Sequence, residues 1–321
     1  MKKISILFLT TLFLGCNKTK DPIQPVIEKG LFKNQTINIS GTQRNYHLFI
    51  PDNTTNAPIV FLFHGNGSNY DDMLGLSGVK APYKIWLDIA QQENVIVVVP
   101  NGTLGSSNSR GWNDCRNDAL TNPLVDDVTF ISNLIDFIKT KYNANTLKVF
   151  AMGTSNGGHL VIRLAQEIPA KVTAFASIVA ANAVNSKCTN STIKISALFM
   201  NGTNDPIMPY LGGQIASNRG EVFSTDNTIA YWVQRNATNP TPEITNINDL
   251  NTSDNSTVTK HLYKNGGSNT EVALYRVNDG GHTEPSIAQR YSPLFLLTVG
   301  NQNGDIEMAQ EVWNFFKTKS K

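Results

Sequence analysis

The chain has 321 residues, of which 40% are hydrophobic and 16% are charged, and its formal net charge is +2. This length and composition fit a globular protein with one large α/β domain or two small ones, and they exclude a disordered chain or a coiled coil. We expect Lys2 and Lys3 to be removed with an export signal, which leaves the mature chain nearly neutral. Because the sequence contains no Lys/Arg cluster, nucleic acid is not an expected partner.

The N-terminal stretch MKKISILFLTTLFLGC has the pattern of a bacterial export signal. Two lysines precede an apolar run from Ile4 to Leu14, which is too short to span a bilayer, and Gly15 precedes Cys16. The ending LFLGC resembles a lipobox, in which the cysteine becomes the lipidated N-terminus, although Phe13 is not a favoured residue at its position. The alternative is an ordinary signal peptide with a chance cysteine.

We therefore predict a signal peptide over residues 1–15, a lipidated tether over 16–33 and an exported protein. Acyl chains on Cys16 would hold it on a bacterial membrane, with the outer membrane or the cell surface as the expected location. With Cys16 assigned to this anchor, Cys115 and Cys188 remain. An oxidising compartment permits a disulfide between them, and two buried free thiols are the alternative.

Apolar runs that end in Gly, Asn or Asp alternate with helical patterns along the rest of the chain. An alternating stretch first predicts an antiparallel hairpin over 36–51. The continuous apolar runs predict strands buried on both faces, at 57–69, 94–102, 146–153, 194–202 and 272–282. Patterns with helical spacing lie at 83–93, 126–142, 156–168 and 305–319.

Strands that alternate with helices predict a mostly parallel central sheet with helices on both faces, the α/β-hydrolase arrangement. We expect one such domain over 34–321. The polar segment around 236–269 is rich in Asn, Thr, Ser and Pro, and we expect it to form a loop-rich insertion above the sheet.

The stretch KVFAMGTSNGGHL places Ser155 between an apolar strand and a helix, inside the pattern Gly-x-Ser-x-Gly. The pattern alone is weak evidence, because a tight turn can contain a serine by chance. However, Asp205 follows a later strand in NGTNDP, and His282 follows another in NDGGH. The order serine, acid, histidine is that of an α/β-hydrolase, and parallel strands bring their carboxyl ends to one edge. We therefore predict Ser155 as nucleophile, His282 as base and Asp205 as the acid that orients the histidine.

Such an enzyme also needs donors for the oxyanion of the tetrahedral intermediate. We expect the backbone N–H of Asn156, next to the nucleophile, to supply one donor. The turn HGNGSN predicts the second at Asn66, with Gly67 as an alternative. His64 in the same turn is expected to hold the loop by hydrogen bonds.

Other titratable residues compete less well for the catalytic roles. Asp114 and Asp279 are the rival acids, and Asp279 lies only three residues from His282, where we expect it to shape the loop. His159 lies one helical turn after Ser155, and we expect it to have a packing or rim role.

These motifs resemble those of a known family, the secreted polyhydroxybutyrate depolymerase and feruloyl esterase group of α/β-hydrolases. The resemblance extends over about residues 46–316 and rests on HGNGSN, VVVPNG, GWNDC, VDDVTFI, GTSNGG, NGTNDPIMPY, GGHTEP and DIEMAQEVWNFF. It implies hydrolysis of carboxylic esters, polymeric ones included, through an acyl-enzyme and without a metal or organic cofactor. It also implies that Trp112 and Asn113 lie near the mouth of the active site, and it favours a Cys115–Cys188 bridge.

One departure from the family concerns the choice of substrate. Members commonly carry a tryptophan after the His-Thr pair, where this chain has Glu284. Without an aromatic wall at this position, the choice between feruloyl and polyester substrates stays open. The candidates for the substrate mouth are His64, Gly67, Trp112, Asn113 and Glu284.

The sequence thus predicts a lipid-anchored serine esterase that acts on feruloyl or acetyl esters of plant polysaccharide. The first alternative is a hydroxyalkanoate depolymerase, and lower alternatives are a prolyl-oligopeptidase-like peptidase and a non-catalytic glycan-binding lipoprotein. A peptidase of that type usually carries a propeller domain, for which this chain has no room, and a non-catalytic protein would have a broken triad.

Overall fold

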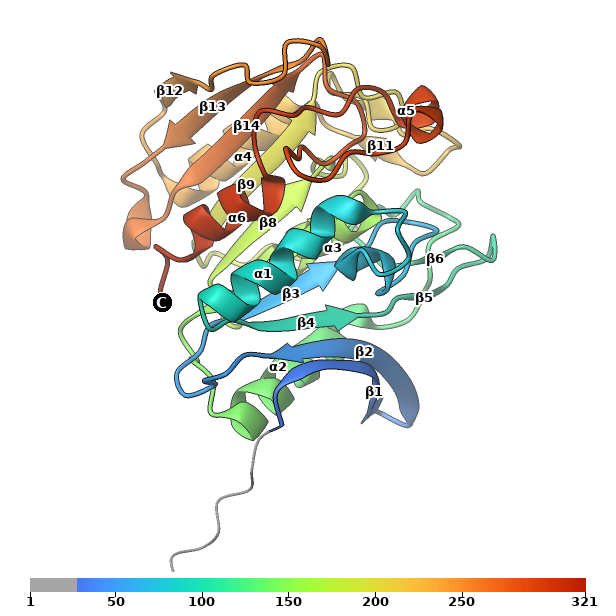
Figure 1. The fold of residues 1–321 in the computed structure, drawn as a ribbon, viewed down its shortest axis with the longest axis vertical. Helices are drawn as coiled ribbons and strands as arrows, with labels where there is room; N and C mark the ends of the chain where they lie inside the picture. The colour runs from blue at the N-terminus through green and yellow to red at the C-terminus, as the bar shows by residue number, and fades with distance from the viewer. Residues whose placement is uncertain (1–27) are drawn as a thin grey trace, which may run out of the picture.

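A ten-stranded sheet forms the centre of the computed structural model, which describes residues 28–321 (Figure 1). The signal peptide, Cys16 and most of the predicted tether lie outside the described residues. Across the sheet the strands follow the order β1-β2-β4-β3-β7-β8-β9-β14-β13-β12. Their bounds are β1 (Gly30–Ile39), β2 (Thr42–Ile50), β3 (Ile59–Phe63), β4 (Ile96–Pro100), β7 (Val149–Thr154), β8 (Ala174–Ile178), β9 (Ser196–Gly202), β12 (Glu243–Asn246), β13 (Thr257–Tyr263) and β14 (Val272–Asn278).

The middle of the sheet is parallel, from β4 through β3, β7, β8 and β9 to β14. Antiparallel strands extend it at both edges, where β2 pairs with β4 and β13 pairs with β14. The predicted hairpin corresponds to β1 and β2. The mostly parallel sheet that the apolar runs predicted is therefore confirmed.

Helices cover both faces of the sheet, as predicted. In Figure 1, α1 and α6 lie in front of the sheet and α2, α3 and α4 lie behind it. The helices are α1 (Ile85–Gln92), α2 (Asp127–Tyr142), α3 (Asn156–Glu167), α4 (Thr225–Asn236), α5 (Pro293–Val299) and α6 (Met308–Phe316), with the short 3₁₀ helices η1 (Asp72–Leu74), η2 (Ala81–Lys84) and η3 (Gly267–Asn269). Among residues 28–321, no helix has the length and apolar character needed to cross a membrane.

The core consists of two apolar layers, one on each side of the sheet. Trp86 of α1 and Trp313 of α6 pack on one face, whereas Phe130 of α2, Leu160 of α3 and Trp232 of α4 pack on the other. Every residue of β3, β4, β7, β8 and β9 is buried, which explains why these strands are continuously apolar rather than alternating.

Two expectations about segments need correction. The segment around 236–269 is not only a loop-rich insertion, because β12 and β13 extend the sheet there in antiparallel pairing. Its polar residues suit an edge that is covered less completely than the centre, and Glu243–Asn246 is exposed along its whole length. The predicted tether also ends too late, because β1 begins at Gly30 and pairs with β2 from there.

Candidate active site

Ser155 lies on a sharp turn between β7 and α3. Its backbone has φ 52° and ψ −119°, a conformation that L-residues rarely adopt. Its N–H donates to the carbonyl of Ile178 at the end of β8, which holds the turn against the neighbouring strand (2.9 Å). The strained turn that the Gly-x-Ser-x-Gly pattern predicted is therefore present, with the side chain between strand and helix.

Glycines allow this turn to form because backbone passes close to them on both sides. A Cβ on Gly153 would lie 2.1 Å from the carbonyl oxygen of Gly157. A Cβ on Gly157 would lie 2.2 Å from the carbonyl oxygen of Phe63 in β3. No side chain fits at either position, so the glycines set the distance at which α3 follows β7.

Asp205 and His282 come from the loops after β9 and β14, and they meet at the carboxyl edge of the sheet. His282 Nδ1 lies 2.7 Å from Asp205 Oδ2. The second oxygen, Oδ1, accepts the backbone N–H groups of Ile207 and Met208 at 2.7 and 2.8 Å. Asp205 is thus held by its own loop and in turn orients the imidazole, which leaves Nε2 of His282 available for chemistry.

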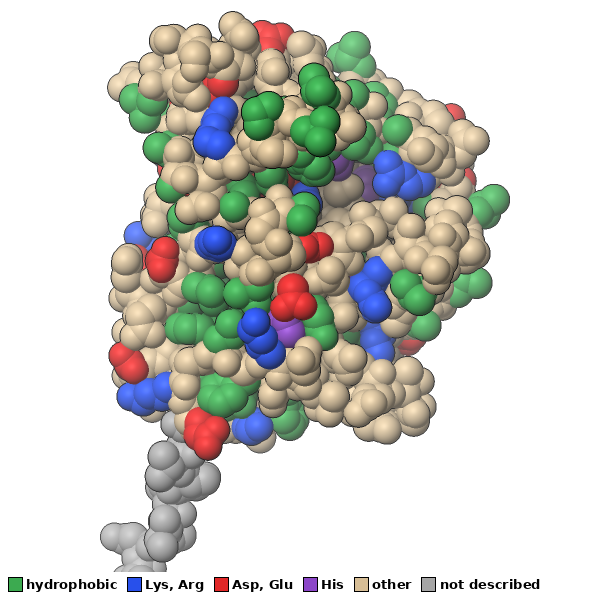
Figure 2. All heavy atoms as spheres, turned by 45° about the vertical axis from the view of Figure 1, so that its right-hand side comes forward, with side chains coloured by type: hydrophobic (Ala, Val, Ile, Leu, Met, Phe, Trp, Pro, Cys, Tyr) green, Lys and Arg blue, Asp and Glu red, His purple; other side chains and the backbone are tan. Residues whose placement is uncertain are grey.

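Ser155 and His282 line the same cleft, which has a volume of about 270 Å³. They also share a smaller pocket beside it. Within the described residues no hydrogen bond joins Ser155 Oγ to His282 Nε2; such bonds often tighten only when substrate is bound. Figure 2 shows a hollow in this face, with histidine side chains visible inside it and hydrophobic side chains gathered above it.

The predicted oxyanion donors lie beside this cleft. Asn66 lines both the cleft and the smaller pocket, and Asn156 lines the pocket. The backbone N–H groups of Asn66 and Asn156 have no hydrogen-bond acceptor in the described part of the chain. By contrast, the N–H of Gly67 already donates to Arg110 (2.7 Å), so of the two candidates in this turn Asn66 has the free donor.

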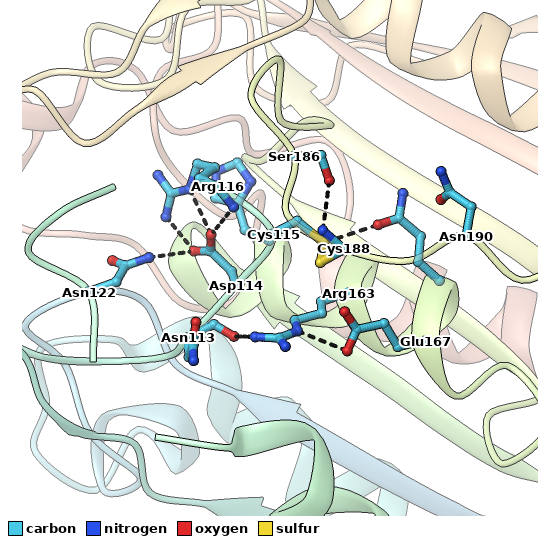
Figure 3. The surroundings of a disulfide bond; sticks show 12 residues. Asn113, Asp114, Cys115, Arg116, Asn122, Arg163, Glu167, Ser186, Cys188 and Asn190 are labelled. Atoms are coloured by element: carbon cyan, nitrogen blue, oxygen red, sulfur yellow. Dashed lines mark hydrogen bonds and ion pairs between the residues drawn. A yellow bond between two sulfur atoms is a disulfide. The ribbon is translucent and has the colours of Figure 1, made fainter. Parts of the chain in front are cut away.

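The Asn156 side chain is fixed away from the cleft by a buried polar network. Its Oδ1 accepts the backbone N–H of Trp112 (2.7 Å), and its Nδ2 donates to Asp114 (2.7 Å). Figure 3 shows Asp114 beside Arg116 and Asn122, both of which donate to it. Burial opposes the charge on Asp114, but Arg116 outweighs this effect and lowers the pKa of the carboxyl to about 2.

Neither rival acid takes the place of Asp205. Asp114 is committed to Arg116, and Asp279 accepts a hydrogen bond from Asn204 (3.0 Å). His159 is buried and lies with Nδ1 2.9 Å from the carbonyl oxygen of Ala181, and burial lowers its pKa to about 3. It therefore lines the smaller pocket as a buried neutral group, which agrees with the expected packing or rim role.

Four of the five candidates for the substrate mouth are not at the mouth. Trp112 is fully buried, and its indole N–H donates to the carbonyl of His64 (2.9 Å). Asn113 holds the start of α2, because its N–H donates to Asp127 (2.8 Å). Both residues follow β6 (Arg110–Gly111) and are buried, so they support the residues around the site rather than line the cleft.

His64 is also buried, as the expected loop-holding role requires. Its Nε2 accepts the N–H of Gly102 (2.9 Å), and its Nδ1 lies 2.8 Å from the carbonyl of Gly65. Burial lowers the pKa of His64 to about 4, so the ring stays neutral at neutral pH. Gly67, with φ 77°, is the one mouth candidate that lines the cleft.

Glu284 is completely buried rather than exposed at the mouth. Thr154, the residue before Ser155, donates to it (2.5 Å), Lys80 forms an ion pair with it (3.4 Å), and the hydroxyls of Tyr83 and Tyr291 donate to it. Burial alone would raise the pKa of this carboxyl, but Lys80 and the three hydroxyl donors together lower it to about 2. Glu284 therefore joins β7, the strand that leads to Ser155, to the loops around the cleft.

Cys115 and Cys188 form a disulfide with a Cα–Cα distance of 5.1 Å (Figure 3). The bridge joins the loop after β6 to the segment between β8 and β9. The pairing favoured by the family resemblance is therefore present. In residues 28–321, no group of three or more His, Cys, Asp or Glu side chains is arranged to hold a metal ion.

The sequence analysis missed Arg219, which lines both the cleft and the smaller pocket with Ser155 and His282. It lies in the turn between the short strands β10 (Gly213–Gln214) and β11 (Glu221–Val222), which form a separate two-stranded sheet rather than part of the main one. No sequence motif marks Arg219.

A larger cavity of about 700 Å³ lies elsewhere, between α4 and the strands β13 and β14, and none of the predicted catalytic residues lines it.

An α/β-hydrolase is the class of protein that this fold and site define, and solved structures share the fold. An acetyl xylan esterase from Aspergillus awamori superposes with a TM-score of 0.52 at 16% identity, over 84% of this chain and 98% of that one. A thermostable esterase gives a TM-score of 0.50 at 14% identity, over 90% of this chain and 63% of the other.

Within this class, the chain belongs to the family described as putative esterase, whose model matches residues 37–282. It is similar to a probable feruloyl esterase C from Aspergillus flavus, with 28% identity over 231 residues, 71% of this chain and 75% of that protein. It is also similar to a bifunctional acetylxylan esterase/xylanase from Neocallimastix patriciarum, with 28% identity over 171 residues, but it covers only 22% of that protein. The chain is a carboxylic ester hydrolase.

Proposed function

We propose that this enzyme is an exported serine esterase that removes feruloyl or acetyl groups from plant polysaccharide. The contact between His282 and Asp205, at a cleft that Ser155 also lines, is the observation that carries the serine mechanism. The substrate class is supported by the names of the relatives, which are feruloyl and acetylxylan esterases.

In this mechanism His282 Nε2 takes the proton from Ser155 Oγ as the oxygen attacks the ester carbonyl carbon. Asp205 holds Nδ1 and stabilises the imidazolium that forms. The imidazolium then gives its proton to the leaving alcohol, and Ser155 keeps the acyl group. Water repeats the sequence with His282 as base, which releases the acid and restores the serine.

The negative charge of each tetrahedral intermediate would rest on the oxygen of the former carbonyl. The N–H groups of Asn66 and Asn156 are suited to receive it, because both lie beside Ser155 without an acceptor of their own in the described residues. One such donor typically lowers the barrier by about 3 kcal/mol.

The serine mechanism predicts that Ser155→Ala lowers kcat for p-nitrophenyl acetate by about 10⁴-fold or more, since the attacking oxygen is lost. Ser253→Ala removes an exposed hydroxyl on a distant loop and is the matched control. Full activity of Ser155→Ala would show that another residue is the nucleophile.

The substrate class is tested by measuring the acid released from methyl ferulate, acetylated xylan and hydroxybutyrate oligomers. The proposed feruloyl or acetyl specificity is wrong if only the oligomers react.

We also propose that the enzyme is held on the membrane surface through a lipidated Cys16. The lipobox-like sequence before Cys16 supports this, as does the start of the first strand at Gly30, which leaves a short segment between anchor and domain. Cys16→Ala should move ester hydrolase activity from the membrane fraction to the soluble fraction, because one or more acyl chains would be missing. A variant that stays in the membrane fraction would contradict lipid anchoring.

A further inference from the structure

We propose that Arg219 forms an anion subsite beside Ser155 and that the preferred esters carry a carboxylate close to the scissile bond. This inference rests on the proposed function, since it assigns the carboxylate to the substrate of that serine esterase. It goes further by making charge, rather than an aromatic acyl group, the feature that selects the substrate.

The first observation is the position of Arg219. It lines the cleft and the smaller pocket, and Ser155 and His282 line both of these as well. A guanidinium at this position can reach a group attached to either side of an ester that is bound at Ser155.

The second observation is that its guanidinium lacks a carboxylate partner. Arg219 Nε donates to the carbonyl of Ala216 (2.9 Å), and the two terminal nitrogens have no acceptor among residues 28–321. The other cations that line these cavities are committed, because Arg116 pairs with Asp114 and Lys80 pairs with Glu284.

Two acids lie near Arg219 or the cleft, and both already accept hydrogen bonds from other groups. Asp205 accepts from His282 and from two backbone N–H groups. Asp72 accepts from the hydroxyls of Ser68 and Ser77. Neither carboxylate is therefore free to turn toward Arg219, and an incoming anion would meet a guanidinium with two open donors.

The third observation is that the loop presents Arg219 in a fixed position. Arg116 Nη1 donates to the carbonyl of Arg219 (2.7 Å), so one buried arginine holds the backbone of the other. Under the loop, Ile215 and Val222 pack with Met208 in a small apolar cluster. A fork that is held in advance loses little freedom on binding and matches the two oxygens of a carboxylate.

Partial burial of Arg219 strengthens its interaction with a bound anion. Burial and then the neighbouring Arg116 lower the pKa of Arg219, which remains charged at neutral pH. Burial leaves this guanidinium less solvated than an exposed one. A bound carboxylate therefore competes with fewer water molecules and forms a stronger interaction.

The carboxylate could belong to the acid part or to the alcohol part of the ester, and two matched substrate pairs distinguish them. Monomethyl succinate against methyl succinamate places a carboxylate or a neutral amide in the acid part. O-acetyl-lactate against O-acetyl-lactamide does the same in the alcohol part. Titration of the released acid gives kcat/KM for all four esters.

The wild-type enzyme should prefer the carboxylate in at least one pair, and Arg219→Gln should reduce that preference by about tenfold or more. Arg219→Lys should keep part of it, because lysine retains the charge but not the fork. Lys141→Gln, which removes a charge at the exposed end of α2, should leave the preference unchanged. The pair that responds identifies the part of the ester that carries the carboxylate.

The anion subsite is wrong if the wild type prefers the carboxylate in neither pair, or if Arg219→Gln leaves both ratios unchanged. These outcomes leave the proposed function standing, provided that Ser155→Ala still abolishes hydrolysis of p-nitrophenyl acetate. If Ser155→Ala keeps that activity, the serine mechanism fails instead, whatever the ratios are.

Discussion

At the residue scale, Glu284 shows how strongly surroundings decide a role. Its place after the His-Thr pair suggested an exposed position at the substrate mouth, but the side chain is buried with Lys80, Thr154, Tyr83 and Tyr291. A buried carboxylate is tolerated only when it is fully paired, and these donors come from three separate parts of the chain. Glu284 therefore stabilises the end of β7, directly before Ser155.

Glu284→Gln should lower the free energy of unfolding at pH 7 by about 3 kcal/mol, because Lys80 loses its counter-ion in a nearly buried site. Urea unfolding of both proteins measures this difference. Glu93→Gln breaks an exposed ion pair with Lys317 (3.7 Å) and serves as the control, with little expected change. Equal effects of the two substitutions would contradict the structural role of Glu284.

The loss of unfolding free energy caused by Glu284→Gln should depend on pH. The pKa of Glu284 is about 2 in the folded protein, against 4.5 for an unperturbed carboxyl. A lowered folded-state pKa contributes stability that is complete above the unfolded value and is lost as the pH falls through the folded value. The difference between wild type and Glu284→Gln should therefore shrink as the pH is lowered from about 4.5 toward 2. A constant difference would show that ionisation of Glu284 is not its source.

At the element scale, the unit that matters is β7, the turn at Ser155 and α3. The strand is fully buried, and the helix packs on β7 and on the neighbouring β8. The close approach at Gly153 and Gly157 sets the geometry of the turn, and the strained φ of Ser155 follows from it. Strain of this kind persists only where the surrounding structure imposes it.

Gly157→Ala should reduce both thermal stability and esterase activity, because the new Cβ would lie 2.2 Å from backbone in β3. Gly78→Ala is the control, because nothing lies within 4 Å of its added Cβ and only its positive φ of 79° opposes the side chain. That control should cost only about 1–2 kcal/mol of local strain and retain activity. Thermal melts and p-nitrophenyl acetate assays compare the two, and a fully active, stable Gly157→Ala variant would show that this packing is not required.

At the scale of the whole molecule, the disulfide connects segments that the sheet alone does not join. Cys115 and Cys188 are separated by 73 positions, and their bridge lies beside the Asp114–Arg116 pair behind the site (Figure 3). A crosslink over such a distance restricts the unfolded chain strongly, so it should contribute to global stability more than to the chemistry of the site.

The double variant Cys115→Ala/Cys188→Ala should be less stable than the wild type by about 4 kcal/mol in the chain-entropy model. For a domain of this size the thermal midpoint should fall by roughly 10 °C. Reductant should lower the midpoint of the wild type and leave that of the double variant unchanged. If reductant affects neither protein, the bridge is not formed in solution.

Local patterns in the sequence were sufficient for the fold class, for the places of the buried strands along the chain, and for the placement of Ser155, Asp205 and His282 after strand ends. Burial on both faces of a parallel strand leaves a continuous apolar run, and the ends of such strands converge at one edge. Strand ends alone therefore predicted that Asp205 and His282 lie in contact, with Ser155 lining the same cleft as His282.

Only the tertiary structure decided which polar residues face the cleft and which lie beneath it. Trp112 and Glu284 carry no local sign that they are buried, since their burial depends on segments far away in the chain. The polarity of β12 and β13 likewise concealed the last two strands at one side of the sheet, and Arg219 lies in a turn without any motif. The physical reason is the same in each case. The periodicity of apolar residues indicates which face of one segment packs on the sheet, whereas burial and hydrogen-bond partners depend on contacts between segments that are distant in the chain.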